Sequence, residues 1–520
     1  MSHTPPSFFL LGLALVGCLD PHAGIKTDST VVLARCDLAV APLELLARDV
    51  GGAALGRCGH VGVWRETAAR ALELYRPDHT RAGRVAGDNG FGGEVAFSPS
   101  EERMVAWSLE SDLGFGTANV YQTYAELVPV ASIHFQRSPT LAFGAGDELT
   151  VAAAGFSGGE GHIDAEDGTH IDAIEPLAYA GHQVIYMPTY MPTDTGAMSR
   201  ALFAFDIDLR TSQPLGEIAP GWRQVDAASQ REVVQLSGDG RRVVIARECS
   251  LPNNAACPTA LLRVVDTATG QVLVAPEGWT EPRVGAGMLV AAAVSDGIGT
   301  IAADRVVRTL AARELVSVMA AHVLVRRGEL IEAVDPLTGF ATVLGSGSKV
   351  SVSDGGRAAL VASKGPKIWT FHLWGSDRDV ASFEWAPSTP TDRTEPKVVV
   401  LFDDGVSIIA DGLTARVIGA EGREVHRWDG PCVQRPYRSD APPSRLRSVP
   451  LRRDRFLFAA RCSALNGLLV RVDLESGEER VLAEGNTFEF EADASGQVIA
   501  FTYQPLSGTV RELHAGLITP

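Results

Sequence analysis

The chain has 520 residues, of which 45% are hydrophobic and 21% charged. This composition is that of a globular protein and excludes a disordered chain or a fibre, and at about 150 residues per domain it allows three or four domains. The net charge is −17 with no basic block. This charge argues against non-specific nucleic-acid binding and against a basic membrane-binding patch, because both need clustered Lys and Arg; we expect no nucleic-acid partner.

The chain begins with an apolar run of ten residues, 8–17, preceded by no Lys or Arg. The run is too short to cross about 30 Å of hydrocarbon as a helix, and it fits the apolar region of a signal peptide. It ends in Leu15-Val16-Gly17-Cys18. This motif resembles the lipobox of bacterial lipoproteins, which implies cleavage before Cys18 and a diacylglyceryl group on its thiol that carries fatty acyl chains such as palmitate.

The resemblance divides the chain into a signal peptide (1–17), a lipidated tether (18–29) and a folded body (30–520). Leu19 stands where an Asp would indicate retention in the inner membrane, so we expect a lipid-anchored outer-membrane protein that faces the periplasm or the cell surface. An ordinary secretory signal with a chance cysteine, or a buried apolar N-terminal strand, remains the alternative.

Six cysteines follow Cys18, and they fall into three local pairs. Sequence alone allows 15 connectivities, and local pairing gives Cys36–Cys58, Cys249–Cys257 and Cys432–Cys462. The middle pair flanks a loop between two predicted strands, 243–247 and 261–265, whose facing ends can bring Cβ atoms within bridging distance. Disulfides need an oxidising compartment, so the alternative is free buried thiols in the cytosol. The spacings fit no structural zinc site.

Two types of hairpin recur along the chain. In the first, an apolar residue is followed by Ser, Asp and Gly and then by a β-branched run ending in Ala, a pattern that suits a tight turn and a buried strand. It occurs at 97–107, 143–153, 236–246, 294–302, 352–362, 402–410 and 492–500. In the second, an Asp begins the turn and a Gly or Ser ends it. It occurs at 74–81, 205–212, 265–270, 334–339 and 472–477.

Two hairpins make a four-stranded antiparallel sheet, and repetition of such sheets is typical of a β-propeller. The repeats resemble the WD40-like units of the TolB type found in exported bacterial proteins. We therefore expect an all-β chain forming a single β-propeller of seven or eight four-stranded blades, with stacked sandwiches as the alternative. The last blade lacks one strand, and segment 30–35 is predicted to supply it and so cover an open edge.

Few segments suggest chemistry. Residues 155–159 match G-x-S-x-G, but no helix is predicted after Ser157, so a glycine-rich loop is favoured over a nucleophile. The aromatic residues of 186–192 could contact a partner, although packing against a neighbouring blade is the preferred interpretation. Trp369, Phe371 and Trp374 are predicted to lie in cores between blades. No catalytic or cofactor-binding set is identified.

The segment that follows Ser157 is rich in imidazole and carboxylate side chains. His162, Asp164, Glu166 and His170 are candidate ligands for a cation such as Ca²⁺, and a solvated loop is the alternative.

For the whole protein we expect a non-enzymatic, membrane-anchored module that binds a protein or glycan. The alternative is an exported hydrolase or lyase, with or without Ca²⁺, whose site lies at the mouth of the central channel.

Overall fold

The structure, a computed structural model, describes residues 25–26 and 39–518 apart from gaps at connections. The longest gaps are 154–160, 189–199, 219–229, 250–262, 387–394 and 430–449. Several predicted features lie outside the described residues, namely the signal peptide 1–17, Cys18, Cys36, segment 30–35, Ser157, Cys257 and Cys432.

The described residues form β-strands connected by turns, and they contain no helix long and apolar enough to cross a membrane. Strands in the first half make five units. Unit 1 is β3 (Val50–Leu55), β4 (Val61–Arg65), β5 (Ala71–Tyr75) and β6 (Arg81–Ala86); unit 2 is β7 (Phe91–Phe97), β8 (Arg103–Leu109), β9 (Phe115–Gln122) and β10 (Val128–Gln136); unit 3 is β11 (Thr140–Phe143), β12 (Leu149–Ala153), β13 (Gly161–Ala165) and the first part of β14 (His170–Ala180); unit 4 is the rest of β14, β15 (Gln183–Pro188), β16 (Arg200–Asp206) and β17 (Thr211–Ile218); unit 5 is β18 (Gln230–Leu236), β19 (Arg242–Cys249), β20 (Arg263–Asp266) and β21 (Val272–Val274).

The second half continues in the same way. Unit 6 is β22 (Thr280–Val284), β23 (Val290–Val294), β24 (Gly297–Ile301) and β25 (Val307–Ala311); unit 7 is β26 (Glu314–Val318), β27 (Val323–Arg327), β28 (Leu330–Val334) and β29 (Ala341–Ser346); unit 8 is β30 (Lys349–Val352), β31 (Ala358–Lys364), β32 (Trp369–Gly375) and β33 (Ala381–Trp385); unit 9 is β34 (Lys397–Leu401), β35 (Ser407–Ala410), β36 (Thr414–Ile418) and β37 (Glu424–Asp429); unit 10 is β38 (Leu451–Arg453), β39 (Phe456–Cys462), β40 (Gly467–Asp473) and the first part of β41 (Glu479–Ala492); unit 11 is the rest of β41, β42 (Val498–Pro505), β43 (Glu512–Leu517) and β2 (Glu44–Arg48).

Two long strands each belong to two units. Strand β14 pairs with β13 up to Ile174 and with β15 from there on, and β41 passes from β40 to β42 at Gly485. The described residues therefore form eleven four-stranded antiparallel units, where the sequence predicted seven or eight. The short β1 (Ile25–Lys26) adds in parallel to β11.

The predicted hairpins are present. Each hairpin of the first type joins the first and second strands of a unit, except the one at 294–302, which joins the second and third strands of unit 6. Every hairpin of the second type joins the third strand of a unit to the fourth. The strands predicted at 243–247 and 261–265 correspond to the antiparallel pair β19 and β20.

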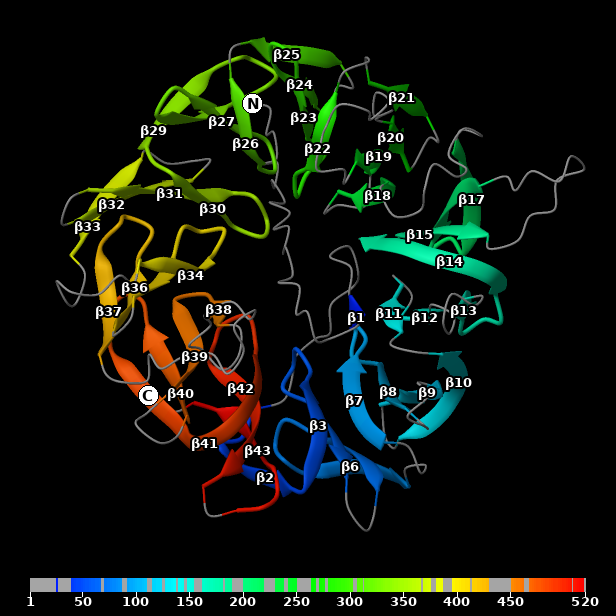
Figure 1. The fold of residues 1–520 in the computed structure, drawn as a ribbon. Helices are drawn as coiled ribbons and strands as arrows, with labels where there is room; N and C mark the ends of the chain where they lie inside the picture. The colour runs from blue at the N-terminus through cyan, green and yellow to red at the C-terminus, as the bar shows by residue number, and fades with distance from the viewer. Residues whose placement is uncertain are drawn as a thin grey trace, which may run out of the picture.

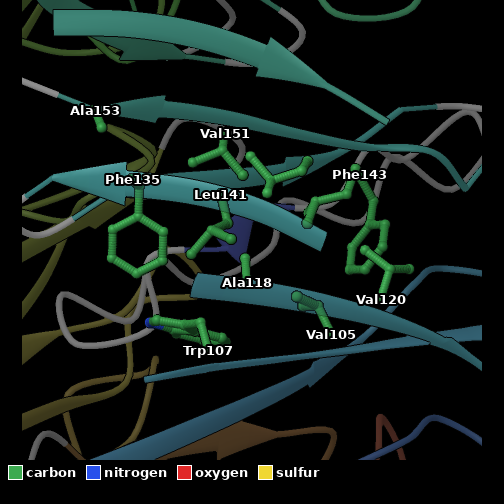
Figure 2. Close-up of a cluster of buried hydrophobic side chains, with 11 residues drawn as sticks. Val105, Trp107, Ala118, Val120, Phe135, Leu141, Phe143, Val151 and Ala153 are labelled. Atoms are coloured by element: carbon green, nitrogen blue, oxygen red, sulfur yellow. The ribbon is translucent and has the colours of Figure 1, made fainter. Parts of the chain in front are cut away.

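The core lies between units rather than within them. Eleven clusters of buried hydrophobic residues each contain side chains from two neighbouring units. Figure 2 shows one of them, in which Trp107 and Val120 of unit 2 face Leu141 and Phe143 of unit 3. A four-stranded sheet has two apolar faces, and burying both requires a neighbour on each side.

Aromatic residues occupy these inter-unit cores as predicted. Trp369 and Phe371 face unit 9, and Trp374, on the other face of β32, packs with unit 7. Tyr186 and Met187 lie on opposite faces of β15, one toward unit 3 and one toward unit 5.

The last unit is completed by an N-terminal strand, but not by the predicted segment 30–35. Strand β2 takes the position beside β43, with Ala47 opposite Leu513. Both residues belong to a cluster that also holds Val50 and Val61 of unit 1, so the first unit packs against the last. In Figure 1 the units follow one another around a common centre, with β30 and β34 nearer to it and β33 and β37 at the periphery.

Candidate functional site

The four candidate metal ligands lie on a hairpin, not in the open loop expected from the sequence. His162 and Asp164 are on β13, and His170 is on β14 directly opposite Asp164. The Asp164 carboxylate contacts His170 Nδ1, and its other oxygen lies 3.5 Å from His162 Nε2. The exposed His170 also lies 3.8 Å from Asp172. The hydrogen bond to Asp164 raises the pKa of His170, because it favours the charged imidazolium.

The fourth candidate, Glu166, contacts other partners than the histidines do. Its carboxylate accepts a hydrogen bond from the backbone N–H of Leu149 at 3.1 Å and pairs with Arg103 of unit 2. Within the described residues, no group of three or more His, Cys, Asp or Glu side chains is arranged to hold a metal ion. The hairpin therefore brings together His162, Asp164 and His170 but separates them from Glu166.

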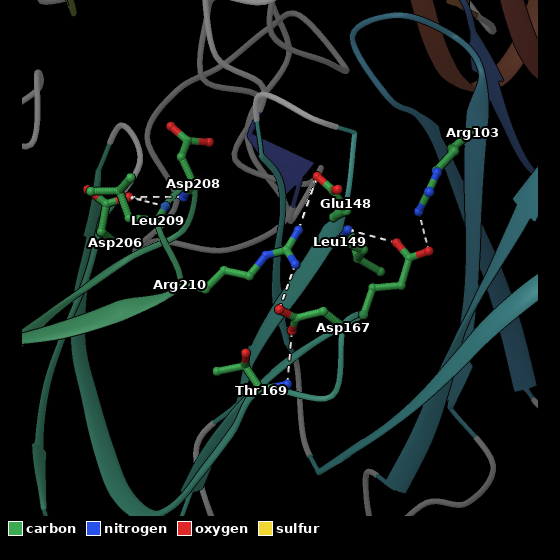
Figure 3. A network of polar contacts seen from close by, with 10 residues as sticks. Arg103, Glu148, Leu149, Asp167, Thr169, Asp206, Asp208, Leu209 and Arg210 are labelled. Carbon is green, nitrogen blue, oxygen red and sulfur yellow. Dashed lines mark hydrogen bonds and ion pairs between the residues drawn. The ribbon is translucent and has the colours of Figure 1, made fainter.

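Glu166 belongs to a charge network that links three consecutive units (Figure 3). Its neighbour Asp167 accepts a hydrogen bond from Arg210 of unit 4 at 2.6 Å, and Arg210 also pairs with Glu148 at 3.1 Å. The Arg210 bond is the main reason that the pKa of Asp167 falls to about 2. Asp167 is thus held as an anion, and the ion pairs of Glu148, Glu166 and Asp167 cross-link neighbouring units.

Two further carboxylates, which the sequence did not single out, link the first turns of neighbouring units. Glu101 of unit 2 accepts hydrogen bonds from the Cys58 N–H at 2.6 Å and from His60 at 2.8 Å in unit 1. Asp147 of unit 3 accepts one from the Ser100 N–H of unit 2 at 3.3 Å. Glu101 and Asp147 have φ of 61° and 63°, in the left-handed region where the equivalent turns of other units carry Gly. Their side-chain bonds offset that strain.

Cys58 itself is buried and disulfide-bonded. Its predicted partner, Cys36, is not among the described residues, and the side chain of Val40 lies against Gly59, next to Cys58. Cys249 and Cys462 end β19 and β39, and their predicted partners also lie outside the described residues. All three pairings therefore remain predictions.

The described carboxyl groups with a clearly shifted pKa share one direction. Each has a lowered pKa because cations, hydroxyl groups or backbone N–H groups stabilise the anion. They are Glu73, Asp78, Asp167, Asp335, Glu395 and Glu479. A general acid near neutral pH requires the opposite shift.

No protein-family model matches the sequence, and neither does any curated protein. Solved structures give weak similarities. The Dos1 propeller is 9% identical, with 92% of this chain and 95% of that chain covered and a TM-score of 0.33. TolB from Acinetobacter baumannii is 11% identical, with 57% and 80% covered and a TM-score of 0.22. The tricorn protease is 11% identical, with 91% of this chain and 61% of that chain covered and a TM-score of 0.23.

This chain thus spans less than two thirds of the tricorn protease chain. With identities and TM-scores this low, the fold assignment rests on the strand order and packing of this chain. Four-stranded antiparallel sheets, packed face to face and with the first against the last, define an all-β protein of the β-propeller class.

Proposed function

We propose that this chain is an exported, lipid-anchored envelope protein whose propeller binds a protein or glycan partner without catalysing a reaction. The observation that carries the proposal is the disulfide at Cys58, because structural disulfides form and persist in oxidising compartments. The lipobox-like Leu15-Val16-Gly17-Cys18 is a matching signal for export and lipidation. Acylation of Cys18 would hold the protein at the membrane through several chains, far more firmly than one chain does.

Cys36 is the proposed partner of Cys58. The contact between Val40 and Gly59 supports this pairing, because it brings the chain close to Cys58 four residues after Cys36. Four residues span at most about 14 Å, which keeps Cys36 within reach. The same bond would fasten the segment that leads from the membrane anchor into β2.

The charge distribution supports a binding module over an acid–base enzyme. Asp167 and Glu166 form ion pairs with arginines of neighbouring units, and these pairs connect the units to one another. A rigid set of turns presents the same surface before and after binding. The protein therefore loses less conformational entropy when a partner binds.

The proposed lipid anchoring is tested by expressing the full chain and a Cys18→Ala variant in a bacterium with an outer membrane. The wild-type chain should partition with outer membranes and gain the mass of acyl chains at its new N-terminus, whereas the variant should be released in soluble form. The same location for both proteins, or an unmodified wild-type N-terminus, would contradict the proposed anchor.

Partner binding is tested by quantitative capture from solubilised envelopes, with the mature protein as bait. A partner should be retained saturably and be competed by an excess of free wild-type protein. Activity screens on glycan and peptide substrates should give no turnover. Turnover that is lost in a carboxylate variant would instead favour an enzyme.

A further inference from the structure

A histidine at the seam between units 9 and 10 has hydrogen-bond acceptors at both ring nitrogens. His426, on β37, lies 2.9 Å through Nδ1 from the carbonyl oxygen of Gly477, and 3.1 Å through Nε2 from Oε2 of Glu479 on β41. A carbonyl and an ionised carboxylate only accept hydrogen bonds. Both contacts are therefore hydrogen bonds only when the ring carries two protons and a positive charge.

Hydrogen bonds keep the Glu479 carboxylate ionised at the contact between units 9 and 10. The indole N–H of Trp428 donates to Oε2, and Arg461 of β39 donates to Oε1 at 2.7 Å. These bonds, together with the one from His426, lower the pKa of Glu479 to about 2 against the opposing effect of burial. His426, Glu479 and Trp428 are all largely shielded from water.

We propose that His426 and Glu479 form a pH-dependent clasp that holds units 9 and 10 together at the rim and weakens when His426 loses a proton. Strand β37 carries His426 in unit 9, and β41 carries Glu479 in unit 10. The clasp therefore stabilises the packing of these two units against each other. Of the described charged groups, Glu479 and Arg461 face the imidazole across the seam, the first favouring its charged form and the second opposing it.

The direction of the pH effect follows from these contacts. The hydrogen bond to Glu479 raises the pKa of His426, with burial opposing and the Gly477 carbonyl reinforcing the increase. The clasp is then complete below the unfolded-state pKa of about 6.5 and is lost as the pH rises through the folded-state pKa. A neutral ring can donate only one hydrogen bond, so either Gly477 or Glu479 loses its donor.

Other histidines provide internal controls. Burial lowers the pKa of His372, and it also lowers that of His322 against the opposing effect of the Asp335 carboxylate. These two residues therefore lose their protons at lower pH than His426 does. A change in the seam between pH 6 and 9 that depends on His426 cannot come from them.

The test is hydrogen–deuterium exchange of the mature protein between pH 6 and 9, corrected for intrinsic exchange rates, on peptides covering β37 and the first part of β41. Wild-type protection should fall as the pH rises, by a factor of about ten for each unit by which folding elevates the pKa of His426. A His426→Gln variant should show no such fall, and a His372→Gln control should behave as wild type.

Glu479→Gln provides a second, independent variant. It removes the anion that stabilises the imidazolium, so the midpoint of the protection change should move to lower pH. Protection of β37 and β41 that is independent of pH in the wild type would overturn the proposal. A midpoint unchanged in Glu479→Gln, or a fall that persists in His426→Gln, would also overturn it.

Discussion

Leu513→Ala tests the packing of the last unit against the first. Leu513 on β43 is 0% exposed and belongs to the same buried cluster as Val50 and Val61 of unit 1. Leu-to-Ala changes in cores cost about 2–5 kcal/mol, and the cost is greatest where the surroundings cannot collapse into the cavity. Leu513 lies in a strand paired on both sides, so we expect a loss of about 3–4 kcal/mol.

Hydrogen exchange under native conditions measures this loss strand by strand, which suits a protein made of repeated units. The opening free energy should fall both in β42 and β43 and in β3 and β4, because the cavity is shared by units 11 and 1. Leu506→Ala, in the same unit but 50% exposed, should change it by less than about 0.5 kcal/mol. A loss below about 1 kcal/mol for Leu513→Ala, or one confined to unit 11, would refute the shared interface.

Two other substitutions test the contacts between turns. Glu101→Gln should lower the free energy of unfolding in urea by about 1–2 kcal/mol, because the amide cannot match the charge-assisted bonds to Cys58 and His60; no change in the urea midpoint would show that these bonds do not support the interface. Gly477→Ala should cost about 2 kcal/mol or more, since φ is +75° and the new Cβ would lie 2.5 Å from the Val425 carbonyl oxygen. The thermal midpoint should fall in that variant, and a wild-type midpoint would contradict the close approach of β37 to this turn.

The hairpins could be predicted from sequence because their determinants are local. Asp, Gly and β-branched residues set the turn and the strands within about ten residues of one another. The number of units could not be predicted in this way. Units 6 and 7 turn at 285–289 and 319–322, where the sequence has no Asp-Gly, so the marker used to count units is missing.

The closing strand shows where intrinsic preference misleads. Segment 30–35 has the β-branched residues that favour strands, whereas β2 reads Glu-Leu-Leu-Ala-Arg, which favours a helix. Strand β2 nonetheless forms because it pairs with β43 and buries Ala47 between units. Its conformation is determined by tertiary contacts that no local pattern records.

The candidate site was predicted only in part, for a similar reason. The register of β13 and β14 places Asp164 opposite His170, which a predicted hairpin could have indicated. The partner of Glu166 is Arg103, 63 residues away in the preceding unit. The role of Glu101 likewise depends on a neighbouring turn, so spacing within one segment could not show it.

An experimental structure of the mature protein tests the central claim most directly. The account predicts eleven four-stranded units, with β43 between β42 and β2 and with Ala47 opposite Leu513 at the contact with unit 1. A structure in which β43 has a free edge, or in which unit 1 and unit 11 do not touch, would contradict it.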